Sequence, residues 1–445
     1  MVGIEGASQP SVARPSAAND VTSSQAMPES GKWTKTYRTY FMALLALTAF
    51  LNILDRLIFS ILLEPIKHDL LLSDTELGIL TGGAFAIVYT IAGFPLGYIS
   101  DKGARRYVLG GTLIVWSAMT AVSGLARNYW QLLFARMGVG VGEAGSLPAS
   151  MAAIADIYPP EKRSGAIGLI YGFGTIGAAA AMAAGGYLET VVGWRSTLMI
   201  VSVPGVVLGL VFLLATRDTP RTHAPEQPLN IRRSIGGILR IPTFRCMTVM
   251  STLFGFFASA IVNWTPTFLM RVHHMTAAHV GWALGMTGIA GGLGALLSGR
   301  LADRFSGGDV RRLIAVMVLG PVMGLPIFWY FLFAGDGSAA IASFFAVQFL
   351  LPAYLGPSYA LVISVVPKSS RALSIAIIAF FQNLLGYTLG PVMVGWLNDA
   401  FRPSYGQDGI RISLAIVSLA IFGVAAMGLL TCRFAARDVH AAETD

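Results

Sequence analysis

The ten residues LNILDRLIFS, numbers 51–60, place an acid beside a base in the middle of an apolar run from about residue 40 to 63. About 20 residues at 1.5 Å rise each cross the ~30 Å hydrocarbon layer of a bilayer, so this run is long enough to span a membrane. Asp55 and Arg56 are disfavoured at that depth by roughly 2.5–3.5 kcal/mol each. Such side chains face a protein-lined or watery cavity, and we expect the rest of the chain to build it.

The composition is that of a polytopic membrane protein. Of 445 residues, 55% are hydrophobic and only 12% are charged, whereas an average soluble domain carries about 25% charged residues. The apolar residues come in blocks of twenty or more, which excludes a large soluble enzyme. The formal net charge of +8 could fit a nucleic-acid partner, but the location of the charge decides otherwise.

Twelve apolar blocks predict twelve transmembrane helices and an all-α fold. A six-helix bundle is expected at 37–216 and a second at 242–434, joined by a cytoplasmic linker at 217–241 with a short amphipathic helix at 231–239. Segments 1–36 and 435–445 are expected to be cytoplasmic tails, the first of them disordered. The expected spans are 37–64, 73–100, 106–126, 129–158, 164–189, 193–216, 243–271, 276–301, 311–334, 338–366, 370–398 and 409–433.

The positions of Lys and Arg predict the orientation. Twenty-three of the 31 lie in the N-terminal tail, the loops after even-numbered spans or the C-terminal tail, and six lie in the opposite loops. Cytoplasmic loops carry the excess of Lys and Arg. Both termini are therefore expected in the cytoplasm, with the chain in a plasma membrane (a bacterial inner membrane). The excess of positive charge is explained by this topology and does not indicate a nucleic-acid partner.

The two halves repeat at nearly one offset. The run GYISDK at 97–102 follows the second span, and GRLADR at 299–304 follows the eighth, 202 residues later. Residues 72–78 and 275–281 match at an offset of 203. Duplicated helical units in transporters place a binding site near the bilayer midplane, between the repeats.

Over residues 37–435 the chain resembles a major facilitator superfamily transporter. The run from Gly97 to Arg106 is similar to that superfamily's signature between helices 2 and 3, with Ala104 where the pattern prefers Gly, and RMGVGVGE at 136–143 is similar to its helix-4 signature. The resemblance implies two pseudo-symmetric six-helix bundles around a central cavity.

Within that superfamily, the pair Asp55-Arg56, residues 140–144 and Pro148 resemble the spinster family. That family includes sphingosine-phosphate and lysophospholipid transporters and many bacterial homologues. Organic-anion symporters share an Asp-Arg pair in helix 1, so a symporter of small organic acids stays open as an alternative.

Four ionisable residues are expected to meet inside the membrane. Arg136 and Glu143 are seven residues apart on one helix, about 20° off the same face, and the resemblance implies that helices 1 and 4 both line the cavity. Two acids and two bases balance, so one proton or one anion shifts the cluster by a full charge. We expect Glu143 to bind the driving proton, because its nearest certain Arg is two turns away, and Asp55 to tune or share it. A fixed network that only holds helix 1 to helix 4 is the structural alternative.

The other candidates are expected to bind substrate. Arg56 and Arg136 suit an anionic head group, because guanidinium forks pair with phosphate or carboxylate. The second half has no ionisable residue deep in any span and offers polar and aromatic side chains instead. This asymmetry predicts a substrate that is charged at one end and apolar at the other. Besides the two arginines, the predicted contacts are Asn52, Phe59, Ser60, Asn263, Trp264 and Tyr354.

Charged residues at cytoplasmic helix ends are expected to form a gate. Asp101 would cap the N-terminus of helix 11 near Ser370, favoured by the helix dipole, and Asp303 would face the start of helix 5 at Ser164. Such contacts exist only when the halves meet on the cytoplasmic side, so they favour the outward-open state. The other gating candidates are Gly97, Arg105, Arg106, Arg163, Arg304 and Arg371.

These patterns predict a proton-linked secondary transporter of an amphipathic, lipid-like molecule (a sphingolipid or lysophospholipid type), working by alternating access as a monomer among membrane lipids. A symporter of organic anions, a multidrug exporter and a non-transporting receptor are the alternatives. No nucleophile–base set, metal-ligand spacing or nucleotide loop predicts an enzyme. We therefore expect no catalytic residue, no metal and no cofactor, with the proton as the coupling ion.

Overall fold

The computed structural model describes residues 34–101, 105–219, 231–307, 309–367 and 370–444, and in these parts the chain is almost entirely helical. The predicted all-α fold is confirmed. The first half holds α1 (Lys35–Leu70), α2 (Asp74–Gly78), η1 (Ile79–Gly83), α3 (Ala84–Asp101), α4 (Arg105–Leu125), α5 (Tyr129–Ala144), α6 (Ser146–Ile157) and α7 (Pro160–Ala215).

The second half begins with a short helix, α8 (Ile231–Arg240), at the place where the linker was predicted to carry one. The elements that follow are α9 (Pro242–Val272), α10 (Ala277–Ser306), α11 (Val310–Phe333), α12 (Gly337–Leu350), η2 (Leu351–Tyr354), α13 (Leu355–Val365), α14 (Arg371–Phe381), η4 (Gln382–Tyr387), α15 (Thr388–Tyr405), η5 (Gly406–Asp408), α16 (Gly409–Ser418) and α17 (Ala420–Thr444).

These elements make twelve spans within the described residues. Nine helical stretches are long and apolar enough to cross a membrane. Two of them, Glu161–Ala215 and Arg371–Ala442, each contain two spans, because the chain turns at Gly193 and again at η5. The twelfth is formed by α5 and α6, which meet at Gly145. Gly193 has φ +76°, a conformation that glycine adopts at no steric cost, and this permits the tight turn.

The repeat seen in the sequence marks two helix starts. Ser73 forms a capping box with Glu76 at the N-terminus of α2, in which each side chain bonds the other residue's backbone N–H. Thr276 caps α10 by accepting a hydrogen bond from the His279 amide. Both caps therefore begin the second span of their own half.

The predicted boundaries were wrong at two helix ends. α1 continues six residues past the expected end at residue 64, to Leu70, and this extension carries Lys67. The segment expected to be a C-terminal tail continues α17 instead, and Asp438 accepts a hydrogen bond from the Thr243 amide at the start of α9 (3.0 Å).

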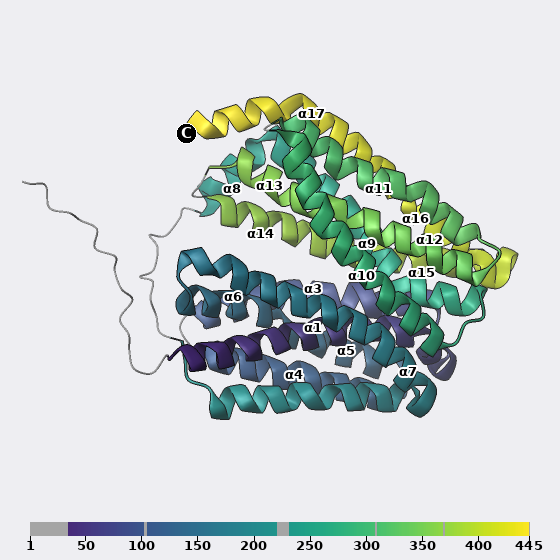
Figure 1. The fold of residues 1–445 in the computed structure, drawn as a ribbon. Coiled ribbons are helices and arrows are strands. Elements are labelled where there is room, and N and C mark those ends of the chain that lie inside the picture. The colour runs from purple at the N-terminus through teal and green to yellow at the C-terminus, as the bar shows by residue number, and fades with distance from the viewer. Residues whose placement is uncertain (1–33, 102–104, 220–230, 308, 368–369, 445) are drawn as a thin grey trace, which may run out of the picture.

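The two halves form two bundles (Figure 1). α1 begins and α17 ends on the same side of the molecule, called here the termini side, and the opposite side is the far side. The bundles pack against each other toward the far side, where α7 contacts α10 and α2 contacts α15. Gly281 of α10 lies so close to α7 that a Cβ there would collide with the Met182 carbonyl. Small residues allow this close approach of transmembrane helices.

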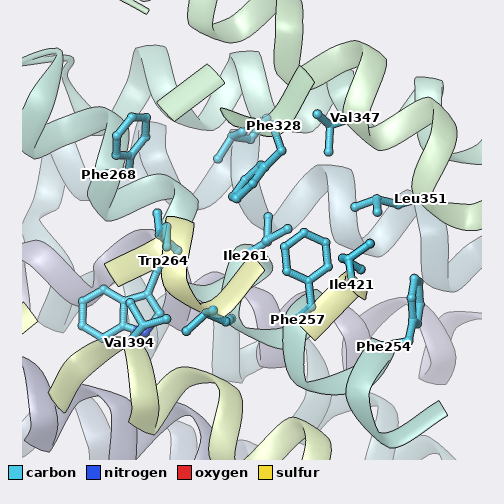
Figure 2. Close-up of a cluster of buried hydrophobic side chains, with 14 of the residues drawn as sticks. Phe254, Phe257, Ile261, Trp264, Phe268, Phe328, Val347, Leu351, Val394 and Ile421 are labelled. Carbon is cyan, nitrogen blue, oxygen red and sulfur yellow. The ribbon is translucent and has the colours of Figure 1, made fainter. Parts of the chain in front are cut away.

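Helix α9 forms the centre of the second bundle. Phe254, Phe257, Ile261, Trp264 and Phe268 recur at intervals of three or four residues, so they share one face, and all five are buried. Figure 2 shows this face packed against side chains from α11, α12, α15 and α17. The resulting core holds α9 rigidly, which fixes the position of its opposite, cavity-facing side.

The contact between Gly281 and α7 can be tested with two alanine variants. Overpacking of this kind costs roughly 1–3 kcal/mol, so Gly281→Ala should lower the melting temperature of the purified protein. Gly288→Ala, seven residues along the same helix, is the control, because a Cβ there meets nothing within 4 Å. Equal melting temperatures for the two variants would show that the close packing of α7 on α10 is not formed.

Candidate functional site

An ion pair joins α1 to α5 inside the first bundle. The Arg56 guanidinium donates to the Glu143 carboxylate, with Nη2 2.8 Å and Nε 3.3 Å from Oε2. The Glu143 side chain is fully buried, and its Oε1 has no hydrogen-bond partner among the described residues. Asn52, one turn before Arg56, lies near the same carboxylate. The structure therefore joins the predicted helices 1 and 4, here α1 and α5, through charged side chains.

Asp55 faces a different helix from its neighbour in sequence. Its Oδ1 accepts a hydrogen bond from the Thr120 hydroxyl of α4 (2.7 Å), and its Oδ2 has no partner within the described residues. Glu143 was chosen as the proton carrier because its nearest certain Arg is two turns away, and this premise was wrong, since Arg56 bonds its carboxylate directly. Successive side chains on a helix point about 100° apart, so Asp55 and Arg56 diverge, and the packing of α1 on α5 brings Arg56 to Glu143.

Both arginines lie against aromatic rings. The Arg56 guanidinium is 4.8 Å from the Phe85 ring centre and 5.0 Å from that of Tyr89. The Arg136 guanidinium is 4.3 Å from the Phe59 ring centre. Arg136 is only 2% exposed. Such cation–π contacts stabilise a cation away from water.

A cavity of about 290 Å³ lies between the bundles at this cluster. The first bundle contributes both arginines, and the second contributes only uncharged side chains. The wall is therefore cationic on one side and neutral, partly amide and hydroxyl, on the other. The lining residues are Arg56, Leu57, Phe59, Thr81, Phe85, Ala86, Tyr89, Arg136, Ala258, Ser259, Val262, Asn263, Asn383 and Tyr387.

Some predicted substrate contacts reach this cavity and others do not. Phe59 and Asn263 line it, and Ser60 bonds across the bundles to Asn263 Oδ1 (2.9 Å). Trp264 is fully buried in the second bundle, where its indole N–H donates to the Pro391 carbonyl (3.0 Å). Tyr354 is also buried, bonded to Ser251 (2.7 Å). Trp264 and Tyr354 were wrongly expected at the cavity, because sequence alone cannot separate a core aromatic from a lining one.

The sequence reasoning missed several lining residues. Thr81, Phe85 and Tyr89 follow one another at four-residue spacing in the second span, so a search for a polar and aromatic face on that span would have found them. Thr120 was missed as well. It lies among other hydroxyl residues of α4, and its sequence context gives no sign that it faces Asp55.

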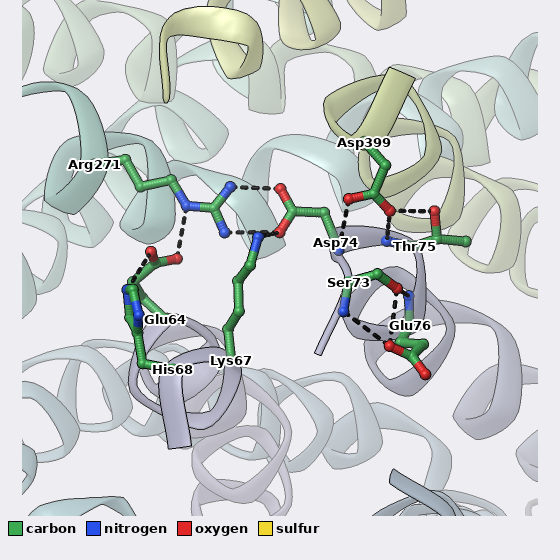
Figure 3. A network of polar contacts seen from close by, with 9 residues as sticks. All are labelled: Glu64, Lys67, His68, Ser73, Asp74, Thr75, Glu76, Arg271 and Asp399. Atoms are coloured by element: carbon green, nitrogen blue, oxygen red, sulfur yellow. Dashed lines mark hydrogen bonds and ion pairs between the residues drawn. The ribbon is translucent and has the colours of Figure 1, made fainter. Parts of the chain in front are cut away.

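On the far side, a second set of polar contacts joins the bundles (Figure 3). Arg271 of α9 reaches across to two acids of the first bundle, Glu64 (2.7 Å) and Asp74 (2.8 Å). Lys67 also pairs with Asp74. All four side chains are at most 12% exposed, so these contacts are shielded from solvent.

Asp399, in the second half of α15, caps the N-terminus of α2 from the other bundle. Its carboxylate accepts from the backbone N–H of Asp74 (3.0 Å) and of Thr75 (2.8 Å), and from the Thr75 hydroxyl (2.6 Å). A carboxylate is favoured at a helix N-terminus by the helix dipole. The far-side contacts, meaning those of Arg271 and Asp399, can form only when the bundles meet there. These contacts were not predicted from the sequence.

The gate predicted on the termini side lies partly outside the described residues. The side chains of Asp101 and Asp303 are among the parts that are not described. The basic candidates contact their own bundle: Arg105 pairs with Asp156, and Arg163 donates to the Ala155 carbonyl (2.7 Å). Arg106 donates to the Thr216 carbonyl of the same half (3.1 Å). Between residues that the structure describes, no hydrogen bond across the bundles is found for Gly97, Arg106, Arg163, Arg304 or Arg371.

Loss of the Asp399 charge should open the far side. Asp399→Asn keeps the size of the side chain but removes the charge, so the state that is open on the far side should become more populated. An impermeant thiol reagent added on that side should then label Thr81→Cys faster, in a chain whose Cys246 and Cys432 are replaced by Ser. Asp408→Asn is the control, because Asp408 is exposed and pairs only with its near neighbour Arg411. Unchanged labelling in Asp399→Asn would reject a gating role for the far-side contacts.

Comparison with known proteins places the chain among membrane transporters. Residues 45–391 match the family model of the Major Facilitator Superfamily. A protein of Mycolicibacterium smegmatis called MFS-type efflux pump is 33% identical over 400 residues, which cover 88% of this chain and 92% of that protein. The sphingosine-1-phosphate transporter SPNS2 of Xenopus tropicalis is 23% identical over 412 residues, covering 88% and 80%.

The fold is also shared with a solved structure. It is the crystal structure of a bacterial homologue of the human lysosomal transporter spinster, in an inward-facing and unoccupied conformation. It superimposes with a TM-score of 0.84 at 25% sequence identity, over 91% of this chain and 99% of that one.

Proposed function

Since the chain belongs to the Major Facilitator Superfamily and is a transporter related to spinster proteins and efflux pumps, we propose that it carries an amphipathic, lipid-like anion by proton-coupled alternating access. The observation that carries this proposal is the two-sided cavity, with two arginines on one wall and uncharged side chains on the other. An anionic head group with a single apolar chain matches both walls.

The arginines are suited to the head group. Arg56 is 29% exposed and lines the cavity, so an anion can reach the guanidinium N–H groups that do not face Glu143. Arg136 lines the same wall beside Phe59. The apolar chain would lie along Leu57, Ala258 and Val262. A phosphate-bearing lipid is consistent with the substrate named for SPNS2 of Xenopus tropicalis.

Proton coupling would follow from a competition for Arg56. In the structure Arg56 is bonded to Glu143. An anion that attracts Arg56 weakens this pair and leaves a buried carboxylate without compensation, which favours its protonation. Anion binding and proton binding then assist each other, and by thermodynamic linkage the assistance is reciprocal. Asp55, bonded to Thr120 in the same cluster, would share the proton.

Alternating access would use the far-side contacts as one of two gates. The closed far side and the likeness to an inward-facing spinster homologue support an inward-facing state, with both termini in the cytoplasm and the chain in a bacterial inner membrane. In the outward-facing state the halves would instead meet on the termini side, where we expect Asp101 and Asp303 to contribute. The cycle needs no cofactor and only one chain.

The 33% identity to an efflux pump favours a second candidate, the export of amphipathic drugs. The same cavity could hold an uncharged or cationic amphiphile only if Arg56 stayed bonded to Glu143. Binding of anionic and neutral amphiphiles therefore separates the two functions.

Removing the Arg56 charge should weaken binding of an anionic amphiphile selectively. A charge-assisted hydrogen bond contributes about 1.5–3 kcal/mol, so Arg56→Gln should raise the Kd for lysophosphatidylglycerol roughly 10- to 100-fold. Affinity for the monoacylglycerol of the same chain length should stay the same. Arg300→Gln, which changes an exposed Arg outside the cavity, is the control. Equal losses for both amphiphiles would contradict head-group recognition.

Neutralising Glu143 should uncouple transport from the proton gradient. Glu143→Gln mimics the protonated acid, so uptake of lysophosphatidylglycerol into proteoliposomes should continue downhill but should no longer respond to an imposed pH gradient. Glu161→Gln alters an exposed acid at the start of α7 and should behave as wild type. Gradient-driven accumulation by Glu143→Gln would remove this residue from the coupling step.

A further inference from the structure

We propose that Thr120 is a positioning residue that keeps Asp55 hydrogen-bonded in both of its protonation states. This inference rests on the proposed function, in which Asp55 takes part in proton binding. Thr120 projects from α4, a helix that contributes no residue to the cavity lining. It would therefore act on Asp55 from the side that faces away from the cavity, without touching substrate.

The Thr120 hydroxyl lies between two acceptors. Its Oγ1 is 2.7 Å from Asp55 Oδ1 and 3.1 Å from the backbone carbonyl oxygen of Trp116. A hydroxyl has one proton to donate and lone pairs with which to accept, so it can satisfy only one of these acceptors at a time. Thr120 is 1% exposed and Asp55 is 4% exposed, which keeps bulk water from replacing either bond.

The two positions of the hydroxyl proton match the two states of the acid. When Asp55 is ionised, Thr120 donates to Oδ1. When Asp55 is protonated on Oδ1, the new O–H donates to Thr120 Oγ1, and the Thr120 proton turns to the Trp116 carbonyl. In each state both Asp55 Oδ1 and the Thr120 hydroxyl are therefore hydrogen-bonded. This avoids the cost of leaving a buried polar group unpaired. The exchange needs only a rotation about the Cβ–Oγ1 bond.

No other direct partner is found for Asp55 in the described parts of the chain. Its Oδ2 accepts no hydrogen bond there, and its charged neighbours are Arg56 on its own helix and Arg136 and Glu143 on α5. These charges set the field around Asp55, whereas Thr120 supplies the directional bond. A change at Thr120 should therefore alter the titration of Asp55 without altering the charge of the cluster.

The sign of the effect follows from bond strength. A hydrogen bond to an ionised carboxylate is roughly twice as strong as a neutral one. Thr120→Val keeps the shape but removes both bonds, so it disfavours the ionised state more than the protonated state. The protonated form should then persist to higher pH, with a titration midpoint raised by about one pH unit, since 1.36 kcal/mol corresponds to one unit.

Infrared difference titration of the full-length protein in liposomes measures this directly. The band to follow is the carbonyl stretch of a protonated carboxyl that disappears in Asp55→Asn. In Thr120→Val its midpoint should move up by about one unit, and its frequency should rise, because the protonated acid has lost its acceptor. Thr120→Ser retains the hydroxyl and should restore both values.

Thr112→Val is the matched control. Thr112 lies two turns earlier on α4, is similarly buried, and donates only to the Leu109 carbonyl of its own helix (3.2 Å). If Thr120→Val fails to fold, Thr120→Cys, with its weaker thiol donor, should show a smaller shift in the same direction. An unchanged midpoint and frequency in the Thr120 variants, or equal shifts in Thr112→Val, would overturn this inference and leave the proposed function standing. If no titrating carboxyl band is lost in Asp55→Asn, the role of Asp55 in the proposed function is overturned, and this inference with it; a band from Glu143 is expected to remain.

Discussion

The ion pair between Arg56 and Glu143 is the interaction on which the rest of the site depends. It joins α1 to α5 within the membrane-spanning part of the first bundle, where an unpaired charge would be strongly disfavoured. Breaking a buried pair by removing one partner is costly, so the pair can open only if another anion or a proton compensates. Phe85 and Tyr89 hold the guanidinium from the side of α3. The cluster thus couples helix packing to the charge state of the cavity.

The two bundles have different tasks. The first carries the ionisable residues, whereas the second presents uncharged side chains on a helix, α9, that a dense aromatic core holds in place. They are locked together on the far side by Arg271 and Asp399, both from the second bundle, acting on α1 and α2 of the first. In the proposed cycle the second bundle would move as a rigid unit against the first bundle, whose ionisable residues would take up the proton.

Much of the architecture could be predicted from the sequence. Blocks of apolar residues, the placement of Lys and Arg and the repeat at 97–102 and 299–304 were sufficient for twelve spans in two halves. The charged cluster was also predictable, because acidic and basic side chains inside an apolar span are costly in lipid and turn toward one another or toward a cavity. The pairing within it was not, because helix rotation decides whether Arg56 meets Asp55 or Glu143. Trp264 and Tyr354 show the same limit, since a buried aromatic and a lining aromatic have the same local sequence.

The central claim is that an anion and a proton bind to the Arg56–Glu143 pair together. Calorimetric titration with lysophosphatidylglycerol, whose phosphodiester stays singly charged across the pH range, tests it when repeated in two buffers of different ionisation enthalpy. The account predicts an uptake of up to about one proton per bound anion, because linkage is reciprocal, and no uptake in Glu143→Gln. Binding of the anion to the wild-type protein with no proton uptake at any pH would contradict it.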